Sequence, residues 1–172
     1  MLHQVTASLA PVPLVGAAAR PTGLVAGTLI RTTEGEFPVE YLLAGDLIET
    51  VNNGAVELRG TSLVEARDVD VVSFTDDRSS RAPDGARRRL VVPVNQQILV
   101  HDWRAQILHG QDAMLTPASS LVDEVQVTRQ RRARLRLIRL HFDTPQVIWA
   151  DGVEVASART RAPAIRGPRT LH

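Results

Sequence analysis

The chain has 172 residues, enough for one domain with a sizeable core, and 44% of them are hydrophobic. Aromatic residues make up only 3%, so we expect a core of aliphatic side chains. The formal net charge of +1 favours neither an acidic nor a basic partner. The absence of cysteine excludes disulfides, thiolate metal sites and a thiol nucleophile.

Both ends of the chain lack the periodicity of regular structure. Residues 1–22 hold a proline-broken apolar run without a basic leader, which is too short to span a bilayer as a helix. Residues 158–172 mix Arg, Pro, Ala and Gly. We therefore expect two flexible tails around a domain of residues 23–157, with no clear signal peptide and no membrane partner.

The first half of this domain predicts short strands, because apolar and polar residues alternate between turns marked by Gly, Asn and Asp. The expected strands lie at residues 30–32, 47–51, 56–64 and 68–74. Residues 75–89 then lose all periodicity and include three consecutive arginines. We expect a surface loop there.

The second half continues the β pattern. The expected strands lie at residues 90–94, 97–101, 125–128, 135–142, 146–150 and 153–155. A hairpin-like return over 101–108 and a short helical stretch over 118–121 interrupt them. Ile138 breaks the alternation of its strand, which predicts a β-bulge nearby. Asp151-Gly152 predicts a hairpin. The pattern as a whole indicates an all-β fold.

Three segments near the start of the domain carry a resemblance: Gly27-Thr28-Leu29-Ile30, Pro38-Val39-Glu40 and Gly45-Asp46-Leu47-Ile48. Later, Trp103-Arg104-Ala105 leads to Pro117-Ala118. This spacing resembles the Hint domains, the autoprocessing fold shared by hedgehog C-terminal regions and inteins, and is closest to their bacterial branch. The resemblance implies a compact, pseudo-twofold β domain of two related lobes with long irregular strands.

The same resemblance implies where the catalytic positions fall. The family's first residue is a cysteine or serine that attacks the preceding peptide carbonyl, and it aligns with Gly23, which has no side chain. The histidine that polarises the scissile amide aligns with Gln96, which cannot transfer a proton at neutral pH. The bacterial motif His-x-x-x-Asp-x-His falls at Arg139, Asp143 and Pro145. The family fold also implies that Gly23 and Ser157 lie close together.

These losses predict a degenerate Hint domain that acts as a structural or interaction module, without processing activity or cofactor and as a monomer. One alternative is residual self-cleavage that uses the hydroxyl of Thr22 together with Asp143. The experiment that separates the two is the intact mass of the expressed chain.

A second alternative is binding of an acidic protein or polyanion by a basic strand. The arginines concerned are Arg129, Arg131, Arg132, Arg134 and Arg136. We expect them to line one solvated face, and no interleaved aromatic residue offers stacking to nucleic acid.

The histidines form a third open alternative. His101, His109 and His141 lack the spacing of metal ligands, although a metal or acid–base site built from them stays open. His141 could pair with Asp143, two residues on along the same strand.

Overall fold

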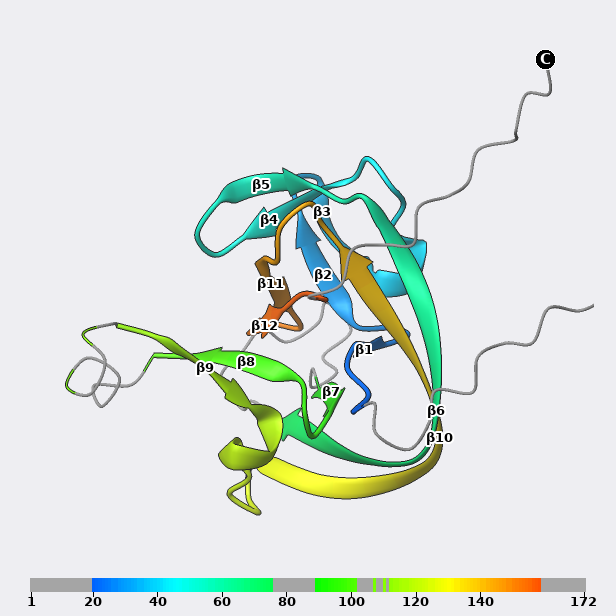
Figure 1. Ribbon diagram of the computed structural model, residues 1–172, viewed down its shortest axis with the longest axis vertical. Coiled ribbons are helices and arrows are strands. Elements are labelled where there is room, and N and C mark those ends of the chain that lie inside the picture. The colour runs from blue at the N-terminus through cyan, green and yellow to red at the C-terminus, as the bar shows by residue number, and fades with distance from the viewer. Residues whose placement is uncertain (1–19, 76–88, 102–106, 108–109, 111, 159–172) are drawn as a thin grey trace, which may run out of the picture.

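The computed structural model describes residues 20–75, 89–101, 107, 110 and 112–158 (Figure 1). Most of the two expected tails, nearly all of the loop over 75–89 and most of the return over 101–108 lie outside these residues. Within the described part of the chain, no helix has the length and apolar character needed to cross a membrane.

Antiparallel strands in two sheets form the domain, which confirms the all-β prediction. The first sheet has the order β1-β10-β6-β7, with β1 at Leu24–Val25, β10 at Val127–His141, β6 at Gly60–Thr75 and β7 at Arg89–Pro93. The second has the order β3-β2-β4-β11-β12-β8-β9, and β5 pairs with β4. Its strands are β2 (Leu29–Thr32), β3 (Gly35–Pro38), β4 (Leu47–Thr50), β5 (Gly54–Glu57), β8 (Gln97–Val100), β9 (Met114–Pro117), β11 (Val147–Ala150) and β12 (Val153–Ala156).

The longest strands, β6 and β10, run side by side as a curved ribbon around the domain (Figure 1). Each joins two strands that the sequence predicts separately. At Asp68 the backbone takes a φ of +50°, so β6 bends there without ending. The two strands expected over 56–64 and 68–74 therefore become the end of β5 and one continuous β6.

The bulge predicted near Ile138 is wrong. β6 and β10 keep one register from Val127 opposite Phe74 to His141 opposite Gly60. Leu137 is fully buried, and Ile138 is half-buried and packs against the hydrophobic core. Both are also register partners of β1. Consecutive apolar residues therefore contact protein on both faces of β10, and no change of phase is needed.

The two halves of the domain repeat one local arrangement, a strand, a return strand and a 3-10 helix that begins after a proline. In the first half, β2 and β3 lead through Pro38 to η1 (Val39–Tyr41). In the second half, β8 and β9 lead through Pro117 to η2 (Ala118–Leu121), where the sequence predicts a short helix. The two prolines have nearly equal dihedral angles, φ −57° and ψ 136° against φ −59° and ψ 139°.

Hydrogen bonds repeat in the same way. The Val39 N–H donates to the Thr28 carbonyl at 2.8 Å, and the Ala118 N–H donates to the Gln96 carbonyl at 2.9 Å. The Thr28 N–H donates to Val25, three residues earlier, and the Gln96 N–H likewise donates to Pro93. Thr28 and Gln96 therefore occupy equivalent positions in two related lobes.

The core between the lobes is aliphatic, as the composition predicts, and Phe142 is the one buried aromatic residue among those that the structure describes. Ile30 of β2 and Ile98 of β8 enter it at equivalent positions, with exposures of 0% and 3%. Burial of such side chains stabilises the fold by roughly 1.5–3 kcal/mol each.

Candidate functional site

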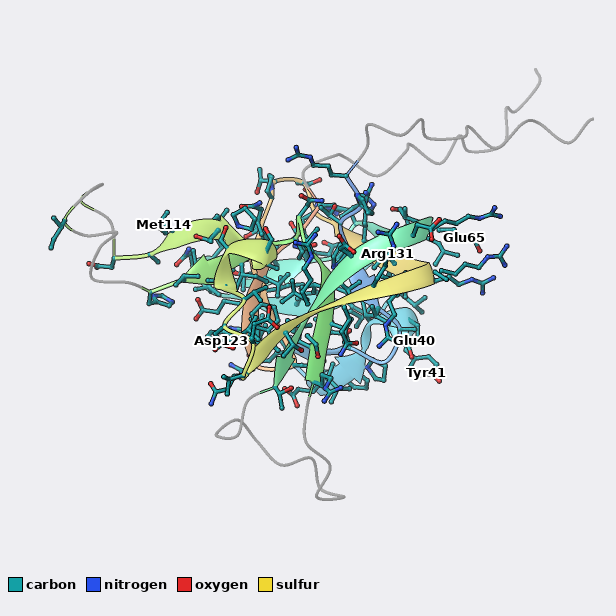
Figure 2. The ribbon with its side chains drawn as sticks, turned by 90° about the horizontal axis from the view of Figure 1, so that it is seen from below. Glu40, Tyr41, Glu65, Met114, Asp123 and Arg131 are labelled. Carbon is teal, nitrogen blue, oxygen red and sulfur yellow. The ribbon has the colours of Figure 1, made fainter. Side chains whose placement is uncertain are left out.

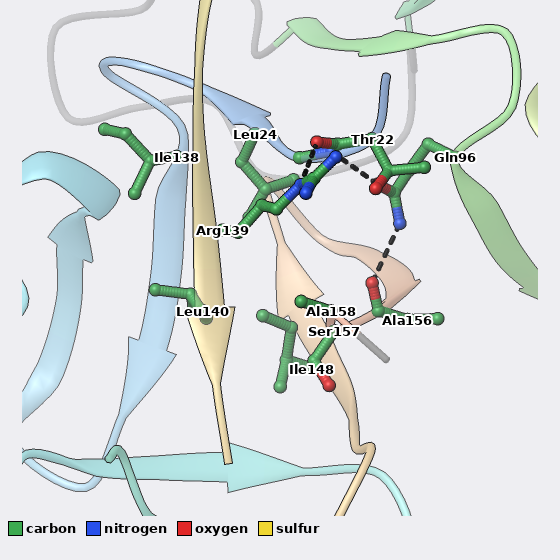
Figure 3. A pocket seen from close by; sticks show the side chains of 11 residues that line it. Thr22, Leu24, Gln96, Ile138, Arg139, Leu140, Ile148, Ala156, Ser157 and Ala158 are labelled. Atoms are coloured by element: carbon green, nitrogen blue, oxygen red, sulfur yellow. Dashed lines mark hydrogen bonds between the residues drawn. The ribbon is translucent and has the colours of Figure 1, made fainter. Parts of the chain in front are cut away.

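The Thr22–Gly23 peptide group, just before β1, is held by side chains on both of its polar atoms (Figure 3). The Gly23 N–H donates to Oε1 of Gln96 at 2.9 Å. Nε of Arg139 donates to the Thr22 carbonyl at 2.9 Å. This is the peptide bond that the resemblance identifies as the processing site.

Gln96 has a fixed orientation in this contact. It follows the turn after β7, is 4% exposed, and donates from Nε2 to the Ala156 carbonyl at 2.8 Å. Since the amide nitrogen of the side chain is used there, its oxygen faces Gly23. The side chain therefore joins three segments, the entry to β1, the start of β8 and the end of β12.

Gly23 could not carry a side chain without strain. Its φ is +136°, which favours glycine. A β-carbon at this position would lie 3.1 Å from both the Ile138 carbonyl oxygen and Cβ of Leu137. The backbone at the nucleophile position is therefore shaped for a residue without a side chain.

These groups surround a small pocket with about 10 Å³ of room for a water-sized sphere, the least that one water molecule needs. Gly23 and Ser157 both line it, which agrees with the expected closeness of the two domain ends. The full lining is Thr22, Gly23, Leu24, Gln96, Ile138, Arg139, Leu140, Ile148, Ala156, Ser157 and Ala158.

Two of the family positions lie elsewhere. Asp143 and Pro145 do not line this pocket. Oδ2 of Asp143 accepts from Nη2 of Arg59 at 2.8 Å and from Nε at 3.0 Å, and this carboxylate raises the pKa of Arg59 further above its ordinary value. Asp143 lies two residues after the end of β10. The resemblance gives its spacing from Arg139 but not its partner, Arg59.

The carbonyl of Ala156 is the functional group that the sequence does not indicate. It is a backbone atom, so no residue type marks it, and only the pairing of β12 with β8 brings it to Gln96. The expected closeness of Gly23 and Ser157 was the one indication that the backbone near Ala156 would reach the site.

The histidines bind separate partners. Nε2 of His101 lies 2.7 Å from Glu154, and Nε2 of the buried His141 lies 2.6 Å from Oγ of Ser62. His109 is outside the described residues. Among the residues that the structure describes, no group of three or more His, Cys, Asp or Glu is arranged to hold a metal ion.

The arginines of β10 do not share one face, so that expectation is wrong. Residues 129–134 are all exposed, and neighbouring residues of a strand point to opposite faces. Arg129 pairs with Asp70 and lowers the pKa of that carboxyl. Arg136 pairs with Glu65 at 3.1 Å.

Comparison with known proteins identifies the family to which these features correspond. Residues 22–162 match the sequence model described as the Hint domain. A search of curated proteins gives no significant match.

Solved structures agree with that family. A bacterial intein-like domain from Clostridium thermocellum has a TM-score of 0.54 at 15% identity and covers 80% of this chain and 99% of its own. A DnaB intein from Synechocystis sp. PCC 6803 has a TM-score of 0.54 at 11% identity, with coverage of 80% and 99%. The gp41-1 intein has a TM-score of 0.50 at 12% identity, with coverage of 78% and 98%. At these identities the likeness shows the fold, and it confirms the predicted Hint architecture.

Proposed function

This chain belongs to the Hint domain family, and we propose that it no longer breaks the peptide bond at the family's processing site but acts as a folded, non-processing module. The observation that carries this proposal is the pair of hydrogen bonds at the Thr22–Gly23 amide, where Gln96 binds the N–H and Arg139 binds the carbonyl.

Cleavage of this amide needs two groups. A nucleophile must attack the Thr22 carbonyl carbon, and an acid must donate a proton to the leaving nitrogen of Gly23. The chain has no cysteine, and Gly23 has no side chain. Gln96 presents an acceptor to the Gly23 nitrogen, while its own donor is bound to Ala156. Both requirements are therefore unmet.

Arg139 supports the same proposal. Its guanidinium polarises the Thr22 carbonyl in the manner of an oxyanion donor. Without a nucleophile this contact has only a structural effect, because it fixes the segment before β1 against β10. The chain consequently enters and leaves the domain at one place, which suits a module that holds two flanking segments together.

The intact mass of the full-length chain tests the proposal, measured after expression with and without hydroxylamine, which captures an ester intermediate. We expect one species of the full mass under both conditions. If Oγ1 of Thr22 attacked the preceding carbonyl, that of Pro21, the Pro21–Thr22 bond would break. A product that lacks the first 21 residues, and that is absent in Thr22→Ala, would therefore establish residual self-cleavage through Thr22.

The variant Asp143→Asn tests whether this aspartate takes part in self-cleavage through Thr22. If Thr22 were active with Asp143 as its base, this variant would abolish the shortened product. Asp143 binds Arg59 and does not line the pocket. We therefore expect the mass spectrum of Asp143→Asn to show one full-length species, as for the unmodified chain.

A further inference from the structure

The bend of the β6–β10 ribbon holds two arginines directly opposite each other. Arg134 of β10 is the register partner of Arg67 of β6, beside the bend at Asp68. Both are exposed, and neither forms an ion pair with any residue that the structure describes. Like charges directly opposite in an antiparallel pair destabilise a sheet. The folded chain alone therefore gives no reason for this pair.

More positive charge surrounds it. Residues 65–70 and 129–136 contain six arginines and three carboxylates, an excess of three positive charges in a chain whose net charge is +1. Two arginines are used in the ion pairs with Asp70 and Glu65. The other four, Arg67, Arg131, Arg132 and Arg134, form the arginine cluster, which occupies both faces of the ribbon because Arg131 and Arg132 are neighbours on one strand. Figure 2 shows Arg131 on the ribbon, which carries outward-projecting side chains.

The cluster lies beside a free strand edge. On the side away from β6, β10 pairs with β1, and only at Leu137 and Ile138. Over residues 127–136 no strand of the described chain covers that edge. Except at Val127, which is hydrogen-bonded to Asp123 and Glu124, the backbone N–H and C=O groups that point away from β6 are therefore available to an additional strand. Extended peptides bind to sheet edges in this way.

We propose that this edge binds an extended acidic peptide segment of a partner protein, which adds as a strand beside β10 with its carboxylates on the arginine cluster. Arginine suits this partner because its planar fork binds carboxylates through two parallel hydrogen bonds. Single-stranded nucleic acid fits less well. Phe74 is the one aromatic residue of the two strands, it is half-buried, and it lies at the far end of β6 from the bend. The proposal is independent of the Thr22–Gly23 site.

Fluorescence anisotropy tests the binding, with the full-length chain and a labelled oligoglutamate peptide of about ten residues, enough to span the free edge. We expect saturable binding that weakens at high salt. Arg134→Gln should weaken it about tenfold, and Arg67→Gln together with Arg134→Gln by more. The matched control is Arg89→Gln. It removes the same charge from an exposed arginine opposite Thr75, at the far end of β6, and should change binding less than about twofold.

Two further measurements distinguish strand addition from charge attraction alone and from nucleic-acid binding. Hydrogen exchange should show protection of backbone amides within residues 129–136 when oligoglutamate is bound. An oligoglutamine peptide of equal length should not bind, and a single-stranded DNA oligomer should bind more weakly than oligoglutamate. Equal loss of binding in Arg89→Gln, absence of saturable binding, tighter binding of DNA, or binding without amide protection would each overturn the proposal.

Discussion

The two lobes of this domain differ at the equivalent positions Thr28 and Gln96. In the first lobe, Oγ1 of Thr28 donates to the Val25 carbonyl at 2.6 Å, within its own turn. In the second lobe, the longer side chain of Gln96 leaves its turn and contacts Gly23 and Ala156. The backbone hydrogen bonds around both residues are otherwise alike.

This difference teaches that the fold and the site depend on different atoms. The turn needs only backbone groups, since its N–H donates to the carbonyl three residues earlier in both lobes. The site needs a side chain long enough to reach across to the other lobe. A Hint scaffold can therefore keep its architecture while the residue at position 96 changes its chemistry.

Substitution of these two residues by alanine should have the largest effect and should be unequal. Gln96→Ala leaves the buried Gly23 N–H and Ala156 carbonyl without their partner, at a cost of roughly 2–4 kcal/mol in the free energy of unfolding. Thr28→Ala removes one local hydrogen bond, at a cost of about 1 kcal/mol. Urea denaturation measures both. Equal losses would mean that Gln96 does not join the lobes.

Two glycine-to-alanine substitutions separate the effect of close packing at the site from that of backbone strain. Gly23→Ala combines the strain of a positive φ with close contacts to Ile138 and Leu137, and should destabilise by roughly 2–3 kcal/mol. The matched control is Gly35→Ala in the first lobe. Its φ of +124° is similar, but no atom lies within 4 Å of the added carbon, so strain alone should cost about 1 kcal/mol. Thermal or urea unfolding measures the loss of stability in each variant. The difference between the two losses gives the effect of close packing at Gly23.

The fold was largely predictable from the sequence, because its determinants are local. Alternation at Ile30, the turn glycines and Asp151-Gly152 gave strands and hairpins that the structure contains. The prediction that failed concerned the continuity of the two long strands. The sequence around Asp68 and Ile138 contains breaks in pattern, but the ribbon of β6 and β10 continues through both, because contacts from other strands decide the outcome.

The site was predictable only in part. Alignment identified Gly23, Gln96 and Arg139, which the fold brings together. It also suggested Asp143, whose position depends on the path of the chain after β10, and it gave no indication that Arg67 faces Arg134. Cross-strand register is a long-range property, and the residues of one strand do not encode it alone.

The prolines before the two 3-10 helices offer a test in which the lobes should agree. Pro38 and Pro117 are both half-buried and share nearly the same dihedral angles. Each should stabilise mainly by restricting the unfolded chain, so Pro38→Ala and Pro117→Ala should each cost about 0.4–1 kcal/mol. Thermal unfolding compares them directly. If the two losses of stability differed by much more than this range, one lobe would depend on its proline for packing. The lobes would then be equivalent in their hydrogen bonds but not in their packing.

The last comparison concerns an aspartate that follows the 3-10 helix in each lobe. Oδ1 of Asp123 accepts from the backbone N–H groups of Val125, Gln126 and Val127 at 2.8–2.9 Å, whereas Oδ2 of Asp46 accepts from Leu43 alone at 2.8 Å. The backbone donors lower the pKa of Asp123 below its ordinary value of 3.8, led by the Val127 N–H.

Because this pKa is lowered by folding, the stabilisation from Asp123 is fully present above pH 3.8 and is lost as the pH falls through the lower value of the folded state. Asp123→Ala should therefore be less stable than the unmodified chain near neutral pH, and the two should converge in acid. Asp46→Ala, which loses one hydrogen bond instead of three, should show a smaller difference at neutral pH. Urea unfolding over a series of pH values measures this. A constant gap between Asp123→Ala and the unmodified chain down to low pH would mean that the carboxylate charge contributes nothing, and that the three donors need only a neutral oxygen.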